Sequence, residues 1–222
     1  MKKLLSIFLF MLINFNLCNI TNSSHKTYEM KDQVTITSKE EFLQFAKDVN
    51  EGLQYQNANV NLACDITIEL EDNWVPIGTY EHPFLGKFKG NYHKIILNAN
   101  LNSDNVGLFG YSVDSTFENL IVEGTINGQN NVAAFVGYGE NLSFQNCYAT
   151  NLCSVTGKDC VGLFIGCGDG HFNYCGCYST VEGSQYLGSF VGLSTEKSYF
   201  SFCSNYAKSP KGPLNFCSND LI

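Results

Sequence analysis

The chain has 222 residues, of which 44% are hydrophobic and 15% are charged, and its formal net charge is −8. This balance excludes a disordered chain, which would combine low hydrophobicity with high charge, and the length allows one domain with a sizeable core. All 13 basic residues are lysine. Because nucleic-acid binding relies on clustered Lys and Arg, we expect no nucleic-acid partner.

The N-terminus has the composition of a secretory signal peptide. Lys2 and Lys3 precede an apolar run from Leu4 to Phe15. A transmembrane helix needs about 20 apolar residues, so this run is too short to be one. We therefore predict a signal peptide over residues 1–18, a secreted or surface-associated protein, and no transmembrane anchor in the mature chain.

A polar leader follows over residues 19–33. Three Asn-X-Ser/Thr sequons are candidates for N-glycosylation if the host glycosylates and the site is exposed. They begin at Asn19, Asn22 and Asn141.

Residues 34–105 are predicted to hold an N-terminal cap and the first coils of a solenoid. Ser38 and Glu41 form a capping-box pattern. The segment 39–50 that follows places its apolar residues on one helical face, and Gly52 ends it. A solenoid has to cover its open end, so we predict that this helix is the cap. The alternation from Val60 to Ile68 then predicts a half-buried strand.

Residues 106–208 repeat one glycine-aromatic phrase four times. Its phenylalanines are Phe109, Phe135, Phe164 and Phe190, in steps of 26, 29 and 26 residues. The glycines that follow them are Gly110, Gly137, Gly166 and Gly192. A period in this range indicates a solenoid, and about three short strands per period predict one coil of a β-helix. The phenylalanines would stack inside it at about 4.8 Å, with the glycines at bends where a Cβ would clash.

Residues 209–222 break the repeat pattern. Pro210 and Pro213 cannot donate a ladder hydrogen bond. We interpret this tail as a C-terminal cap or stop.

Several phrases occur in an order that resembles a known repeat family. Besides the four repeats they are 38–42 (SKEEF), 62–66 (LACDI), 74–78 (WVPIG) and 84–91 (FLGKFKGN). From Val34 to about Ala207 the chain resembles the GLUG-type repeat modules of exported surface proteins, which also occur beside IgA-specific metallopeptidase domains. The resemblance implies a right-handed parallel β-helix with a surface, adhesion-like role. It does not imply catalysis, because the peptidase activity of such proteins lies in a separate domain.

No catalytic or metal-binding motif stands out. The four histidines lack the spacing of a zinc-peptidase pair, and we expect neither a metal nor a cofactor. A β-helix lyase resembling the known ones would use a basic residue, often arginine, which is absent. Asp159 and Asp169 are the only candidates for a glycosidase-like carboxylate pair, and polar turns are the favoured interpretation of both. An acidic cluster over residues 69–72 is interpreted as a solvated loop rather than a calcium site.

The cysteines form the sharpest side-chain pattern. Cys147, Cys175 and Cys203 are spaced by 28 and 28 residues, one coil each. Neighbouring coils bring Cα atoms within disulfide range, so this trio predicts either a ladder of buried thiols, which we favour, or a disulfide between coils. Four others are candidates for disulfides in turns: Cys153, Cys160, Cys167 and Cys177.

The function most consistent with these features is a non-catalytic adhesion or interaction module that binds an unknown protein or glycan at a cell surface. The alternative is a carbohydrate-binding or carbohydrate-active β-helix of the lyase or glycosidase kind. Tyr148, Tyr178 and Tyr206 recur once per coil. They predict either a surface ladder suited to sugars or a ladder that lines the core or a groove.

Overall fold

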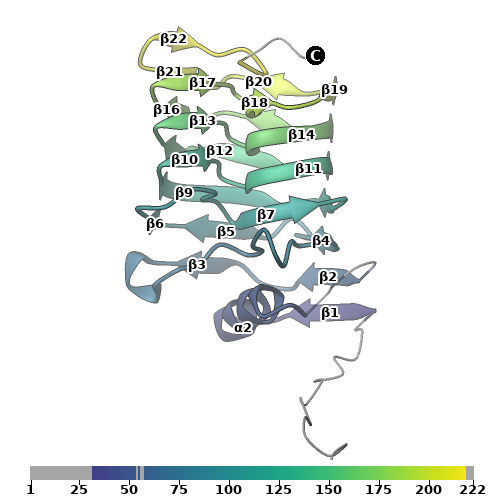
Figure 1. The fold of residues 1–222 in the computed structure, drawn as a ribbon. Coiled ribbons are helices and arrows are strands. Elements are labelled where there is room, and N and C mark those ends of the chain that lie inside the picture. Colours follow the sequence, from purple (N-terminus) through teal and green to yellow (C-terminus); the bar gives the residue numbers. More distant parts are fainter. Residues whose placement is uncertain (1–31, 54, 56–57, 219–222) are drawn as a thin grey trace, which may run out of the picture.

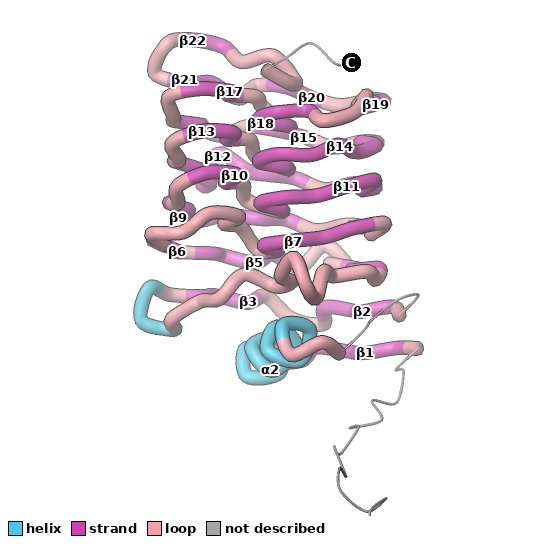
Figure 2. The backbone as a smooth tube through the Cα atoms, in the orientation of Figure 1, coloured by secondary structure: helices cyan, strands magenta, loops and turns pink. Residues whose placement is uncertain are grey.

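The computed structural model describes residues 32–53, 55 and 58–218. The chain forms a parallel β-solenoid of about six turns with one helix near its N-terminus, which confirms the predicted fold class. Figure 1 shows the coils stacked along one axis, with the helix at the N-terminal end. Short loops connect the strands of each coil (Figure 2).

Three sheets make up the walls of the solenoid, named A, B and C here. Sheet A contains β1 (Gln33–Ile36), β2 (Asn59–Leu62), β4 (Lys87–Lys89), β7 (Phe109–Val113), β8 (Thr116–Glu118), β11 (Val136–Gln145), β14 (Ile165–Asn173), β18 (Val191–Ser194) and β19 (Tyr199–Ser201). Sheet B contains β3 (Ile66–Ile68), β5 (Lys94–Leu97), β6 (Ala99–Asn100), β9 (Ile121–Asn127), β12 (Tyr148–Thr156), β15 (Gly176–Cys177), β16 (Thr180–Glu182), β20 (Ser204–Asn205), β21 (Lys208–Ser209) and β22 (Gly212–Pro213). Sheet C contains β10 (Asn130–Val132), β13 (Asp159–Val161) and β17 (Gln185–Leu187). Neighbouring strands pair in parallel, except that β21 and β22 form an antiparallel hairpin.

Stacked phenylalanine rings fill the core. Phe164 lies between Phe135 and Phe190, with ring centroids 4.5 and 4.9 Å apart. A second column stands edge-on beside the first, as in the 88° angle between Phe144 and Phe164. Its members are Phe117, Phe144, Phe172 and Phe200, all on sheet A. Parallel stacking along each column and edge-to-face packing between columns are both favourable ring geometries.

The first repeat is out of step with the other three. Phe109 pairs with Val136 rather than with Phe135, because its phrase is one residue shorter. Its buried ring contacts Phe84 and Phe117, each with a centroid distance of 4.9 Å. The four-membered stack expected from the sequence therefore lacks Phe109. It continues instead past the repeats, where Phe216 lies 5.2 Å from Phe190.

The repeat glycines lie where sheet C comes close to sheet A. A Cβ on Gly137 would come within 2.5 Å of the backbone of Asn105, and one on Gly192 within 2.5 Å of the Val161 nitrogen. Gly110 and Gly166 meet neighbouring backbone in the same way. Any side chain at these positions would push adjacent coils apart.

The helix α2 (Lys39–Asn50) covers the N-terminal end of the core. Ser38 caps it by accepting a hydrogen bond from the Glu41 N–H at 3.2 Å. Its buried face packs against the aromatic core, with Phe42 stacked on Trp74 at 5.6 Å and Phe45 edge-on to Phe84 at 6.0 Å. The helix therefore shields the first coil from solvent, as a cap has to.

Two sequence predictions fall wholly or largely on residues outside the described ranges. The signal peptide and the sequons at Asn19 and Asn22 lie wholly outside them, and so does most of the 19–33 leader. Within residues 32–53, 55 and 58–218, no helix is long and apolar enough to cross a membrane.

The phenylalanine stack yields a prediction about stability. Replacing Phe164 with alanine removes a fully buried ring between two others, so we expect the free energy of unfolding to fall by roughly 3–5 kcal/mol. Urea unfolding followed by circular dichroism measures the change. Phe202→Asn, at an exposed ring, should stay within about 0.5 kcal/mol of the wild type. Equal losses in the two variants would mean that the stack does not hold the coils together.

Candidate functional site

The outer face of sheet B carries a continuous set of functional side chains. Register aligns Lys94, Ile121, Tyr148, Gly176 and Ser204 in one column across five coils. A second column begins at Glu123 and ends at Tyr206. The N-terminal half of this face is polar and the C-terminal half is aromatic. We call the whole surface the sheet B face.

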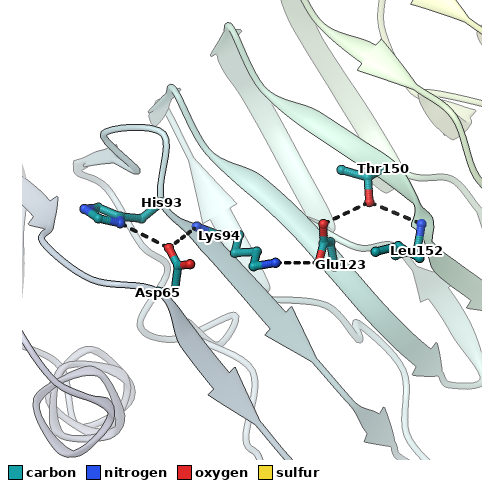
Figure 3. A network of polar contacts seen from close by, with 6 residues as sticks. All are labelled: Asp65, His93, Lys94, Glu123, Thr150 and Leu152. Atoms are coloured by element: carbon teal, nitrogen blue, oxygen red, sulfur yellow. Dashed lines mark hydrogen bonds and ion pairs between the residues drawn. The ribbon is translucent and has the colours of Figure 1, made fainter.

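A chain of polar contacts crosses the N-terminal half of the sheet B face (Figure 3). The Asp65 carboxylate accepts a hydrogen bond from the Lys94 backbone N–H and lies near the His93 ring nitrogen, both at 3.1 Å. The Lys94 ammonium reaches across to the Glu123 carboxylate at 3.4 Å. Thr150 then donates its hydroxyl to the other Glu123 oxygen at 3.3 Å. Each contact except the last turn of the chain joins residues one coil apart.

The network holds its carboxylates in place as charged groups. The hydrogen bond from the Lys94 backbone, together with His93, keeps the pKa of Asp65 below its ordinary value. Glu123 exposes only 11% of its side chain and contacts both Lys94 and Thr150. An ionised carboxylate and a carboxylate bound to a lysine are poor proton donors. The arrangement therefore favours binding and stability over acid–base catalysis.

Aromatic ladders occupy the C-terminal half of the sheet B face. The ring of Tyr178 stacks on that of Tyr206 at 5.4 Å, and the ring of Tyr174 stacks on that of Phe202 at 4.8 Å. Gly176 lies between them, and a Cβ there would meet ring atoms of Tyr178 and Tyr148 at 2.5 and 3.0 Å. The absence of a side chain at Gly176 therefore lets the neighbouring rings close over the strand.

These ladders point outward, which decides between the two interpretations of the tyrosine repeat. Phe202 is 77% exposed and Tyr206 is 71% exposed. Tyr148, lower on the ladder, is half-buried, and this burial raises its pKa. Rings inside a ladder face one another, so a ligand reaches a free ring face only at the end of the stack. The ladder thus offers its two terminal rings rather than a long platform.

One ladder replaces a column of asparagines. Asn119, Asn146, Tyr174 and Phe202 occupy equivalent corners of successive coils, all with φ between 51° and 53°. The Asn146 amide donates to the Asn119 side chain at 3.1 Å. Asparagine tolerates this left-handed conformation better than most residues. The switch to exposed rings in the last two coils is therefore a change in surface chemistry at an unchanged backbone.

All nine described cysteines are free. The disulfides expected in turns do not form, because none of the four candidates has a cysteine beside it in the adjacent coil: Cys153 aligns with Gly124, Cys167 with Tyr138 and Leu193, Cys177 with Ala149 and Asn205, and Cys160 follows Asp159 between Asn130 and Gln185.

The thiol trio does align. Backbone hydrogen bonds tie Cys147 to Gly176 and Cys175 to Ser204 in successive coils. Cys147 and Cys175 are buried and Cys203 is half-buried. Their thiols donate to backbone carbonyls, as Cys147 does to Gln145 at 3.4 Å. The pKa of Cys175 is raised to about 12 by the neighbouring thiol of Cys147. The trio therefore lies in the structure as a ladder of protonated, poorly nucleophilic thiols.

Asp159 and Asp169 lie on different sheets, C and A, of the same coil. Asp169 accepts a hydrogen bond from the Asn141 backbone at 3.2 Å, and burial, with Glu196 and Glu140 nearby, raises its pKa. One oxygen of Asp159 is buried without a hydrogen-bond partner. Asp159 is absent from the groups that shift Asp169, so the structure shows no coupled carboxylate pair here.

Other candidate positions resolve into structural roles. Asn141 is exposed, but its side-chain amide donates to Asp114 at 2.7 Å and the next sequon residue, Leu142, is buried. In the acidic segment, Asp72 pairs with Lys39, which lowers the pKa of Asp72. Among the described residues, no group of three or more His, Cys, Asp or Glu side chains is placed to hold a metal ion.

Comparison with known proteins adds no relative to these observations. No protein-family model matches the chain, and no curated protein or solved structure is significantly similar to it. The GLUG-type resemblance therefore stays a prediction from the sequence motifs.

The polar network was missed from the sequence because its members lie far apart along the chain. Asp65, Lys94 and Glu123 are each 29 residues from the next, which is the coil period. Charged residues of opposite sign recurring at that period are the signal that could have indicated it.

Two aspartates predict opposite effects of pH on stability. The pKa of Asp65 is lowered in the folded chain, so its charge stabilises the fold above the unfolded pKa of about 3.9 and this gain is lost as pH falls through the folded value. The pKa of Asp169 is raised, so its charge destabilises the fold at neutral pH. We expect Asp65→Asn to lower the urea midpoint at pH 7 and Asp169→Asn to raise it, with both differences shrinking toward pH 3.5. Effects of the same sign would contradict the assigned environments.

The Lys94–Glu123 contact predicts a recoverable loss. Lys94→Met leaves the Glu123 carboxylate largely buried without its cation, and we expect the free energy of unfolding to fall by roughly 1–2 kcal/mol. Adding Glu123→Gln should restore most of it, because no charge then remains to be compensated. Lys47→Met breaks the exposed Lys47–Glu51 pair and should change stability by less than about 0.5 kcal/mol. Denaturant titration of the four variants gives the coupling; additive losses would rule it out.

Proposed function

We propose that this chain is a non-catalytic recognition module of an exported or cell-surface protein, and that it contacts its partner through the sheet B face. One observation carries the proposal: the polar network and the aromatic ladders form one outward surface with strongly exposed rings. Scattered exposed apolar residues are ordinary, whereas a cluster of them beside polar groups is typical of an interaction site.

The exposed rings support recognition rather than a purely structural role. Asparagine serves the same corner position in the preceding coils and bonds to its neighbour. Tyr174 and Phe202 therefore are not needed for the backbone conformation at this corner. Large aromatic residues at exposed positions are the ones most often found as anchors of protein and ligand interfaces.

The state of the carboxylates supports the non-catalytic part of the proposal. A glycosidase needs one carboxylic acid and one carboxylate facing each other across a bond, about 5–9.5 Å apart. On the sheet B face, Asp65 is held ionised, and Lys94 lies against Glu123. Neither group is presented to a substrate as a free acid.

Export and membership of the GLUG-type repeat family are part of the same proposal. The N-terminal residues 1–18 and the repeated phrases support them. Seven of the nine described cysteines are buried, so most of these thiols would be shielded in an oxidising environment. A sugar partner, the second candidate, is favoured by the free faces of the terminal rings Phe202 and Tyr206.

A double substitution tests the proposal while preserving the backbone. Tyr174→Asn with Phe202→Asn extends the existing asparagine column and removes two exposed rings. We expect the variant to keep its thermal unfolding curve and to lose at least about tenfold in affinity, or roughly 1.4 kcal/mol, for the glycans or cell-surface proteins that an array identifies for the wild type. Tyr199→Ala, which removes an exposed ring from sheet A, is the matched control and should bind normally.

The same array separates binding from catalysis. Release of reducing or unsaturated sugar ends from a bound glycan by the wild-type chain would overturn the non-catalytic assignment. Equal binding by the wild type and the asparagine variant would show that the sheet B face is not the recognition surface.

A further inference from the structure

A pocket lies at the C-terminal end of the sheet B face, where the β21–β22 hairpin folds beside the last ladder ring. Its volume is about 390 Å³, within the range of roughly 300–1,000 Å³ common for small-molecule sites. The lining residues are Asn205, Tyr206, Ala207, Lys208, Ser209, Gly212, Pro213 and Leu214. We call it the Tyr206 pocket.

The ring of Tyr206 provides a flat apolar surface in this pocket. One of its faces is taken by Tyr178, whose ring lies 5.4 Å away and only 14° from parallel. Within the described part of the chain, no other ring stacks on its opposite face. Ala207, Pro213 and Leu214 add apolar surface around it. A ligand with a flat array of C–H groups would complete the stack.

The polar groups of the pocket divide into two sets. The Asn205 amide donates to the Leu214 carbonyl at 2.8 Å and its oxygen accepts from the Ala207 N–H at 3.2 Å. Ser209 likewise bonds to Gly212 and Lys211. These two residues shape the hairpin. The Lys208 ammonium and the Tyr206 hydroxyl, in contrast, contact no side chain of the described residues through a hydrogen bond or an ion pair and are available to a ligand.

The charge around the pocket is opposite to that of the whole chain. The segment 197–218 contains three lysines and no acidic residue, whereas the chain carries a net charge of −8. Tyr206 and Lys208 are two residues apart and lie on either side of the buried Ala207, so their side chains share the outer face of sheet B. A cation thus stands beside the free ring face.

We propose that the Tyr206 pocket binds a six-membered sugar ring that carries a carboxylate, such as a uronic acid at the end of a glycan. The C–H face of the sugar stacks on Tyr206, and its carboxylate pairs with the ammonium of Lys208. This inference rests on the proposed recognition function and names the ligand class for one end of the sheet B face.

Paired ligands test the charge and the ring separately. Methyl β-glucuronide and methyl β-glucoside differ only in the carboxylate, and saturation-transfer NMR with titration of the full chain measures both. We expect the glucuronide to bind at least about fivefold more tightly than the glucoside, as one ion pair of about 1 kcal/mol gives. Raising the salt from 0.05 to 0.5 M, values chosen as roughly one decade, should remove most of this preference.

Substitutions locate the site. Tyr206→Ala should abolish binding of both sugars, Tyr206→Phe should preserve it, and Lys208→Gln should reduce the glucuronide to the level of the glucoside. Lys211→Gln keeps the ring and the pocket lining and is the control for general charge. Thermal unfolding of each variant shows that the fold is retained, and the retained binding by Tyr206→Phe separates loss of the ring from loss of structure.

Three results would overturn the inference: equal binding of the two sugars, binding that survives Tyr206→Ala, or binding of neither sugar. If the array partner still depends on Tyr174 and Phe202 in those cases, only the pocket assignment fails. If that dependence is also absent, the proposed recognition surface fails as well.

Discussion

Parallel pairing between successive coils is the constraint on which the structure depends. It places each residue directly above its counterpart one period earlier, at the distance of neighbouring strands. Flat apolar rings fill such a column efficiently, which is why phenylalanines can stack from Phe135 through Phe164 and Phe190 to Phe216. The glycines follow from the same constraint, since close approach of sheets A and C leaves no room for a side chain at Gly137 or Gly192.

The same constraint organises the surface. Outward side chains also form columns, so ion pairs and hydrogen bonds run between coils, as from Lys94 to Glu123 to Thr150. For aromatic residues the column has a cost in availability, because stacked rings cover one another's faces. Ligand-accessible ring faces are therefore concentrated at the last coils, where Phe202 and Tyr206 end their ladders. Recognition by this fold should depend on the ends of its columns more than on their length.

Register also decides the chemistry of the cysteines. Cys147, Cys175 and Cys203 share a column and their thiols interact, while Cys153, Cys160, Cys167 and Cys177 each face a different residue type in the adjacent coil. Stability in this chain thus comes from coil stacking and from the end caps, α2 and the segment around Phe216. It does not come from covalent links between the described coils.

The amino-acid sequence by itself determined the solenoid, the capping helix and the burial of the repeated phenylalanines, because these follow from local periodicity and capping signals within a few residues of one another. It also indicated the thiol and tyrosine columns through their 28- to 30-residue spacing. Only the tertiary structure decided the one-residue offset of Phe109, the outward direction of the tyrosines, and the contact of Asp65, Lys94 and Glu123. Those features depend on how the corners of each coil align with the next, and a shift of one residue at a corner exchanges the inner and outer faces.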